Sequence, residues 1–127
     1  MKYISLLVFF VVSLSLSAQL KHQAFDALGK GDLNLLSSLF DSKVELCFDN
    51  KVQYLDKQAT INAVQSFLSK NPPKSCTPLH QGAAKGNTSQ YRIGNFQSTN
   101  GKNFRVFIYS ADNGEKSLIQ ELKIDVQ

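Results

Sequence analysis

The 127-residue sequence has no tryptophan and very little histidine, cysteine or arginine. Its two histidines, His22 and His80, stand far apart, and no Cys-x-x-Cys pair occurs, so the clustered ligands of a zinc site are lacking. The motifs of zinc metalloproteases, P-loops, dinucleotide-binding folds and α/β-hydrolases are missing as well. We therefore expect neither a metal nor a cofactor.

Charge is also sparse. The chain carries 14 basic and 10 acidic residues, and Arg92 and Arg105 are its only arginines. The lysines are scattered singly, whereas a nucleic-acid surface gathers basic residues on one face. We expect a solvated surface and no nucleic-acid partner.

The one long apolar run lies at the N-terminus. Lys2 precedes residues 3–16, which are almost entirely apolar, and the small pair Ser17-Ala18 follows, the order of a secretory signal. The run is shorter than the roughly 20 residues a membrane-spanning helix needs. We expect residues 1–18 to be a cleaved signal peptide, with no membrane anchor afterwards. Residues 19–127 would form a single domain, either periplasmic or secreted.

Two cysteines, Cys47 and Cys76, follow the apolar run. In an oxidising compartment they permit one disulfide, and the alternative is a pair of separate thiols. The sequence leaves both possibilities open.

Three helices are predicted, all before residue 72. Leu20, Ala24, Ala27 and Leu28 recur at helical spacing until Gly29 and Gly31. Asp32 caps a second helix, and Asp56 caps a third that ends at Asn71-Pro72-Pro73. The apolar faces of the last two helices comprise Leu33, Leu36, Phe40, Ile61, Val64, Phe67 and Leu68.

Alternation of apolar and polar residues predicts strands in the rest of the chain. The first pair flanks a turn at Asp49-Asn50-Lys51, and Asn100-Gly101 and Asn113-Gly114 predict later hairpins. The six expected strands are 44–49, 52–55, 79–84, 89–97, 103–111 and 117–126.

This order of elements favours a curved antiparallel sheet wrapped around helices. It resembles the nuclear transport factor 2-like superfamily, which includes ketosteroid isomerases and polyketide cyclases. The resemblance implies an α+β fold, with three N-terminal helices packed on a strongly bent, mostly antiparallel sheet that forms a cone.

A closer resemblance covers nearly the whole chain after the apolar run. It connects the sequence to a family of uncharacterised small secreted bacterial proteins with no established activity, so it implies fold and not function. The segments that carry it are 27–32 leading to Leu39-Phe40, 63–71, His80-Gln81-Gly82, 91–96 and Phe104-Arg105-Val106.

Catalysis in a cone of this kind needs a carboxylate or histidine in an apolar pocket, with hydrogen-bond donors beside it. Asp49 is better explained by its turn and Asp56 by helix capping. His80 is flanked by Leu79 and the small residues that follow Gln81. The weak candidates for ligand binding are His80, Tyr54, Tyr91 and Tyr109. Arg92 and Arg105 lie in the same hairpin as the last two tyrosines and suit either a binding surface or an outer sheet face.

The function we expect is a non-enzymatic exported domain. It would bind a small molecule or a protein partner through the cone mouth or the open sheet face. A homodimer through that sheet face is an equal possibility. The alternative is a cofactor-free isomerase, dehydratase or hydrolase that uses a polar residue in the cone. We expect one core to bury Phe25, Leu36, Phe40, Leu46, Val64, Phe67, Val106 and Leu122.

Overall fold

The computed structural model describes residues 23–83, 89–112 and 116–127. The expected signal peptide and the Asn113-Gly114 turn lie outside these residues. The elements follow the predicted order of two helices, two strands, a third helix and four strands. They are α2 (Gln23–Lys30), α3 (Leu33–Leu39), β1 (Phe40–Phe48), β2 (Lys51–Asp56), α4 (Lys57–Lys70), β3 (Pro73–Ala83), β4 (Ser89–Ser98), β5 (Asn103–Asp112) and β6 (Ser117–Val126).

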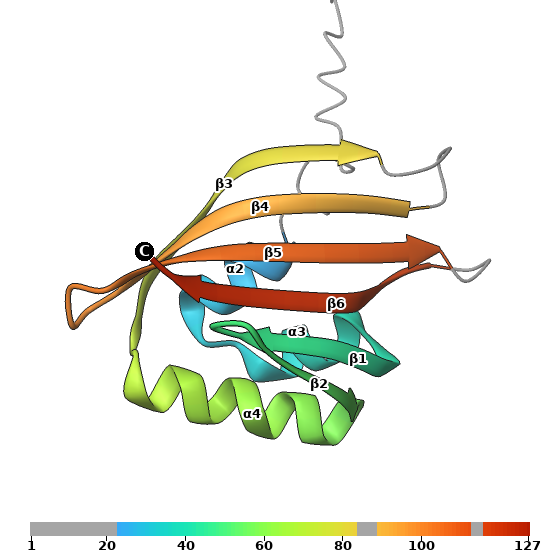
Figure 1. Cartoon of the computed structure of the whole chain (residues 1–127), viewed down its shortest axis with the longest axis horizontal. Helices are drawn as coiled ribbons and strands as arrows, with labels where there is room; N and C mark the ends of the chain where they lie inside the picture. The colour runs from blue at the N-terminus through green and yellow to red at the C-terminus, as the bar shows by residue number, and fades with distance from the viewer. Residues whose placement is uncertain (1–22, 84–88, 113–115) are drawn as a thin grey trace, which may run out of the picture.

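The strands form a six-stranded sheet in the order β2-β1-β6-β5-β4-β3. Neighbouring strands are antiparallel except β1 and β6, which are parallel. Helix α2 packs on β3 and β4, α3 contacts β6, and α4 lies along the β1–β2 hairpin (Figure 1). We call the face that carries the buried side chains the inner face and the opposite face the outer face.

The helix caps are the predicted ones. Asp32 accepts a hydrogen bond from the Leu35 backbone N–H at 3.1 Å, and Asp56 accepts one from Ala59 at 2.7 Å. Each carboxylate satisfies an N–H group that has no partner within its own helix. Gly31, with φ of +68°, ends α2 in the left-handed conformation that glycine adopts freely.

Two boundaries differ from the prediction. Strand β3 begins at Pro73, six residues before Leu79, because β3 is an edge strand and an edge tolerates residues without an N–H. Pro78 also lies in it, next to a shift in register. Phe40 has extended dihedral angles and opens β1, whereas its apolar spacing predicts helix.

The core lies between the inner face and the helices. Seven of the eight residues expected there are buried, and Phe67 is only partly buried, at the margin of the core. The seven are Phe25, Leu36, Phe40, Leu46, Val64, Val106 and Leu122.

Two glycines let α2 approach the sheet closely. A Cβ atom on Gly94 of β4 would lie 2.8 Å from the Phe25 ring and 2.9 Å from the Thr77 carbonyl oxygen. A Cβ atom on Gly29, which lies within α2, would lie 2.9 Å from the Cys76 backbone nitrogen. The sequence predicts that the helix stops at Gly29 and Gly31. In the structure Gly29 lies within the helix, where it allows close packing against β3.

The two cysteines are free thiols and both are buried. Cys47 lies on β1 and Cys76 on β3, and β6, β5 and β4 lie between these strands. At the usual strand spacing this separates the two residues by about 19 Å, far beyond the roughly 7 Å that a disulfide can bridge. The possible Cys47–Cys76 disulfide is therefore incompatible with this sheet, and the alternative of separate thiols describes the structure.

Replacing Gly94 by alanine should destabilise the protein, because the added methyl group meets the Thr77 backbone and the Phe25 ring. We expect a loss of about 1–3 kcal/mol in the free energy of unfolding, measured by urea denaturation. Asn95→Ala, at the next position on the outer face, is the control and should change this free energy by less than about 0.5 kcal/mol. Equal unfolding midpoints for the two variants would contradict the close packing.

Cys76 should resist alkylation in the folded protein. Burial, with a smaller contribution from the nearby Asp26 carboxylate, raises the pKa of Cys76 to about 12. Relative to the ordinary thiol pKa of 9.0, this lowers the thiolate fraction at pH 8 roughly a thousandfold. Mass spectrometry after iodoacetamide treatment should find Cys76 unmodified in buffer and modified in denaturant. Similar alkylation rates in both conditions would show that α2 does not shield the thiol.

Candidate functional site

A cleft of about 520 Å³ opens between α4 and the ends of three strands, β1, β5 and β6. We call it the α4 cleft. Its volume lies within the range of small-molecule pockets, roughly 300–1,000 Å³. The residues that line it are Phe48, Asp49, Gln53, Ala63, Ser66, Phe67, Lys70, Asn71, Lys102, Phe104, Ile124 and Val126.

Aromatic rings form the apolar wall of the α4 cleft. The Phe67 ring stacks on Phe48, with centroids 5.3 Å apart, and meets Phe104 edge-on at 5.0 Å. Phe96, which is fully buried, lies 5.6 Å from Phe67 and continues the cluster into the core. Offset and edge-to-face pairs are the arrangements that aromatic rings prefer. The rings therefore present a packed apolar wall to the cleft.

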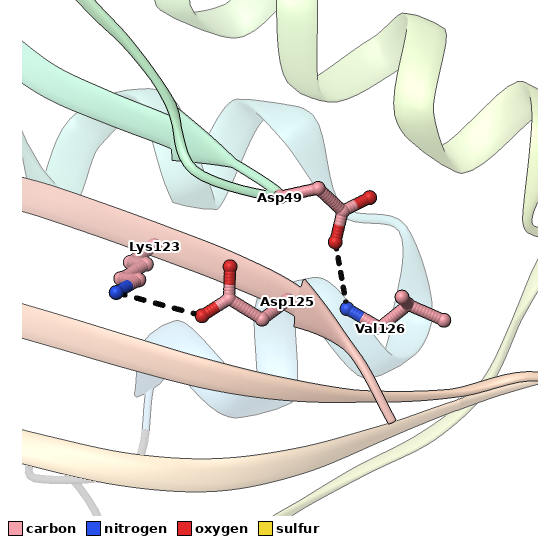
Figure 2. Close-up of polar contacts among 4 residues, drawn as sticks. All are labelled: Asp49, Lys123, Asp125 and Val126. Carbon is pink, nitrogen blue, oxygen red and sulfur yellow. Dashed lines mark hydrogen bonds and ion pairs between the residues drawn. The ribbon is translucent and has the colours of Figure 1, made fainter.

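The polar part of the cleft is mixed. Lys70 in the last turn of α4 and Lys102 in the β4–β5 turn supply two ammonium groups, and Asp49 supplies one carboxylate. The Asp49 carboxylate accepts a hydrogen bond from the Val126 backbone N–H at 2.9 Å (Figure 2). Asp49 and Asn50 both have positive φ and form the β1–β2 turn. Asp49 thus joins this turn to the end of β6, in agreement with its predicted turn role.

Hydrogen bonds fix the C-terminal end of α4 to the β4–β5 turn. The Asn100 side-chain amide donates to the Lys70 carbonyl at 3.2 Å and to Oδ1 of Asn71 at 3.1 Å. Next to it, the Ser98 hydroxyl donates to the Pro72 carbonyl at 2.9 Å. These contacts hold two lysines that are 32 positions apart in the chain at the margin of one cleft.

The three candidate tyrosines lie elsewhere, in one row across the outer face. The register pairs Tyr91 with Tyr109, Tyr109 with Glu121, Glu121 with Glu45 and Glu45 with Tyr54. Directly opposed residues share a face of the sheet. A ligand in the α4 cleft therefore does not touch them.

The outer face combines aromatic rings with charges. The Tyr91 and Phe107 rings stack with centroids 6.0 Å apart. Burial, followed by the Glu45 carboxylate, raises the pKa of Glu121, while Lys123 opposes the rise. Lys123 also forms an ion pair with Asp125 at 3.6 Å (Figure 2). Pairing of two chains across this face stays a prediction.

His80, the remaining candidate, lies in β3, where its backbone pairs with Ile93. Its side chain lies outside the described part of the structure, as do residues 84–88.

Sequence reasoning weighed Asp49 and placed Phe67 in the core, but it did not bring the residues of the α4 cleft together as a site. Phe48, Phe104 and Ile124 each occupy inner-face positions near the end of a strand, which alternation alone could have indicated. Their convergence with α4 needs the tertiary fold. Across residues 23–83, 89–112 and 116–127, no group of three acidic, histidine or cysteine side chains could hold a metal ion. In the same residues no helix is long and apolar enough to cross a membrane.

Known proteins share the sequence pattern and the fold of this chain. A family model described as a domain of unknown function, DUF4783, matches residues 22–125. A DUF4783 protein crystal structure from Bacteroides ovatus has 32% identity and a TM-score of 0.76, over 83% of this chain and 93% of that chain. A second, from Bacteroides uniformis, has 26% identity and a TM-score of 0.76, over 84% and 95%.

A more distant structure shows the wider fold. It is an NTF-2 like protein of unknown function from Silicibacter pomeroyi, with 12% identity and a TM-score of 0.59, over 87% of this chain and 92% of that one. No curated protein matches the sequence. The fold is thus an α+β, NTF2-like one, and the chain belongs to the DUF4783 family.

Proposed function

We propose that this protein is a binding module that takes a small molecule with an apolar body into the α4 cleft. The observation that carries the proposal is the aromatic wall of Phe48, Phe67 and Phe104, which stays accessible from the cleft. Phe67 remains partly exposed although it lies at the centre of this cluster. A ligand that covers this wall would remove its apolar surface from water, at about 25 cal/mol per Å².

The cleft margin favours ligands that also carry a negative group. Lys70 and Lys102 outnumber the single carboxylate of Asp49, whose Oδ1 already accepts the Val126 N–H. An ammonium group on a flexible stem suits a sulfonate, phosphate or carboxylate held at the mouth of the cleft. The ligand class is thus an apolar body with an anionic end.

Binding is favoured over the alternative of a cofactor-free isomerase, dehydratase or hydrolase. A general acid or base must reach the reacting atom within hydrogen-bond distance. Among the described residues that line the cleft there is no histidine or tyrosine, and Asp49 is committed to the β1–β2 turn. The polar groups of the cleft therefore suit recognition better than proton transfer.

Filling the α4 cleft should abolish binding of an anionic, apolar dye. Ser66 is exposed and faces the cleft, so Ser66→Phe places a ring where a ligand would lie. We expect the affinity for 8-anilinonaphthalene-1-sulfonate to fall at least tenfold in a fluorescence titration. Circular dichroism should show an unchanged fold.

Ser69→Phe is the matched control. Ser69 is exposed on α4 one turn further along and does not line the cleft. This variant adds the same ring to the same helix and should bind the dye as the wild type does. Equal dye binding by Ser66→Phe and Ser69→Phe would place the apolar site elsewhere.

We also propose that the domain acts outside the cytoplasm, after removal of residues 1–18. The charged start, the apolar run and the small residues that follow support this, and the family model begins only at residue 22.

Expression of the full chain in a bacterial host should yield a protein that begins at Ala18 or Gln19 in the periplasm or medium. Intact-mass measurement of this fraction checks the result. A mass that still includes residues 1–17 would refute cleavage.

A further inference from the structure

A second cavity lies at the other end of the inner face. It has a volume of about 390 Å³ and lies between the start of α2, the end of α3 and strands β4, β5 and β6. Along β5, Ser110 lines this cavity and Phe104 lines the α4 cleft. Six residues of extended chain separate them, which is about 20 Å. The two cavities are therefore separate sites, and we call the second one the Arg92 cavity.

Arg92 lines this cavity from the inner face of β4. Its neighbours at even positions, Gly94 and Phe96, are buried on the same face, whereas Tyr91 lies on the outer face. Arg92 and Tyr91 are adjacent in the sequence, but their side chains lie on opposite faces of the sheet. Arg105 lies on the outer face, opposite Asp125 of β6. The two arginines of the chain therefore have contrasting surroundings.

The Arg92 guanidinium makes one hydrogen bond, but another of its donors has no acceptor. Nη2 donates a hydrogen bond to Oε1 of Gln90 at 3.0 Å, which orients the group. Nε is buried and has no hydrogen-bond partner. Burial lowers the pKa of Arg92 from its ordinary value, because the surroundings disfavour the positive charge. A buried donor without an acceptor is rare in folded proteins and costly on a charged group.

The rest of the cavity suits an anion. None of the described residues that line it is acidic, and Ser110 and Ser117 add hydroxyl groups. Ala24, Leu39 and Ile119 supply apolar surface. The cavity thus offers one oriented guanidinium, hydroxyl groups and space for a short hydrocarbon part.

We propose that the Arg92 cavity binds the carboxylate of a small organic acid, with Arg92 as the anchoring cation. A guanidinium presents parallel N–H groups that match the two oxygens of a carboxylate. Nε–H, the donor without a partner, supplies one of them, and Gln90 keeps the plane of the group fixed. The apolar residues receive the carbon chain of the acid.

The chain offers a direct spectroscopic test because it contains only two arginines. In a ¹H–¹⁵N spectrum of the purified protein each gives one Nε–H signal, and Arg105→Gln identifies the signal of Arg92. Titration with sodium butyrate at constant ionic strength should shift the Arg92 signal to saturation and leave the Arg105 signal in place. Butyramide, the neutral analogue, should produce no such shift.

Calorimetric titration with butyrate tests the role of each residue. Arg92→Gln should weaken binding at least tenfold, and Arg92→Lys should also weaken it because lysine lacks the planar pair of donors. Arg105→Gln should bind as the wild type does, since this residue does not line the cavity. Arg92→Lys decides the matter if Arg92→Gln does not fold.

Three results would overturn the proposal. The first is an equal shift of the Arg92 signal with butyramide, because charge would then not be recognised. The second is binding of inorganic phosphate without binding of butyrate. The third is unchanged butyrate affinity in a folded Arg92 variant. Because the dye test uses a different cavity and a different variant, failure of either site leaves the other intact.

Discussion

The close contact between α2 and the sheet determines the shape of the inner face. Gly94 leaves room for the Phe25 ring, and Gly29 lets the helix backbone reach the backbone of β3. Without a Cβ atom at these positions, helix and sheet can approach closely enough to bury Phe25 and Leu28 almost completely. The middle of the inner face is therefore filled by side chains, and the two cavities described above lie at its two ends.

Different contacts hold the residues at the two ends of the inner face. The α4 cleft depends on contacts between segments distant in the chain: Asn100 reaches Asn71 and the end of α4, and Asp49 reaches the end of β6. In the Arg92 cavity the guanidinium is held by a local contact, the hydrogen bond to Gln90 two residues away on the same strand. Sites on supported elements keep their geometry, which favours selective binding.

The sequence predicts much of the fold and little of the sites. The caps at Asp32 and Asp56 follow from local hydrogen bonding, and the strands follow from side-chain alternation. Both can therefore be predicted from the sequence. The start of β3 could not be predicted from the sequence. Pro72-Pro73 ends a helix, but on the edge of a sheet a proline can also begin a strand. The inner-face position of Arg92 could have been predicted, since the strand period of two places it on the same face as Gly94 and Phe96. Arg92 was grouped with Tyr91 because they lie on one strand, although their side chains lie on opposite faces. The approach of Lys70 to Lys102 requires tertiary contacts that no local pattern encodes.

The prolines of β3 have a further consequence for how copies of this sheet can add to one another. Pro73 and Pro78 lack N–H groups and a register shift follows Pro78, so the β3 edge is a poor template for another strand. The β2 edge has no proline and exposes Val52 and Tyr54. Of the two edges, β2 is therefore the one that better suits addition of a strand from another chain. Prolines at one edge thus disfavour repeated edge-to-edge addition, the step by which sheets grow into fibres.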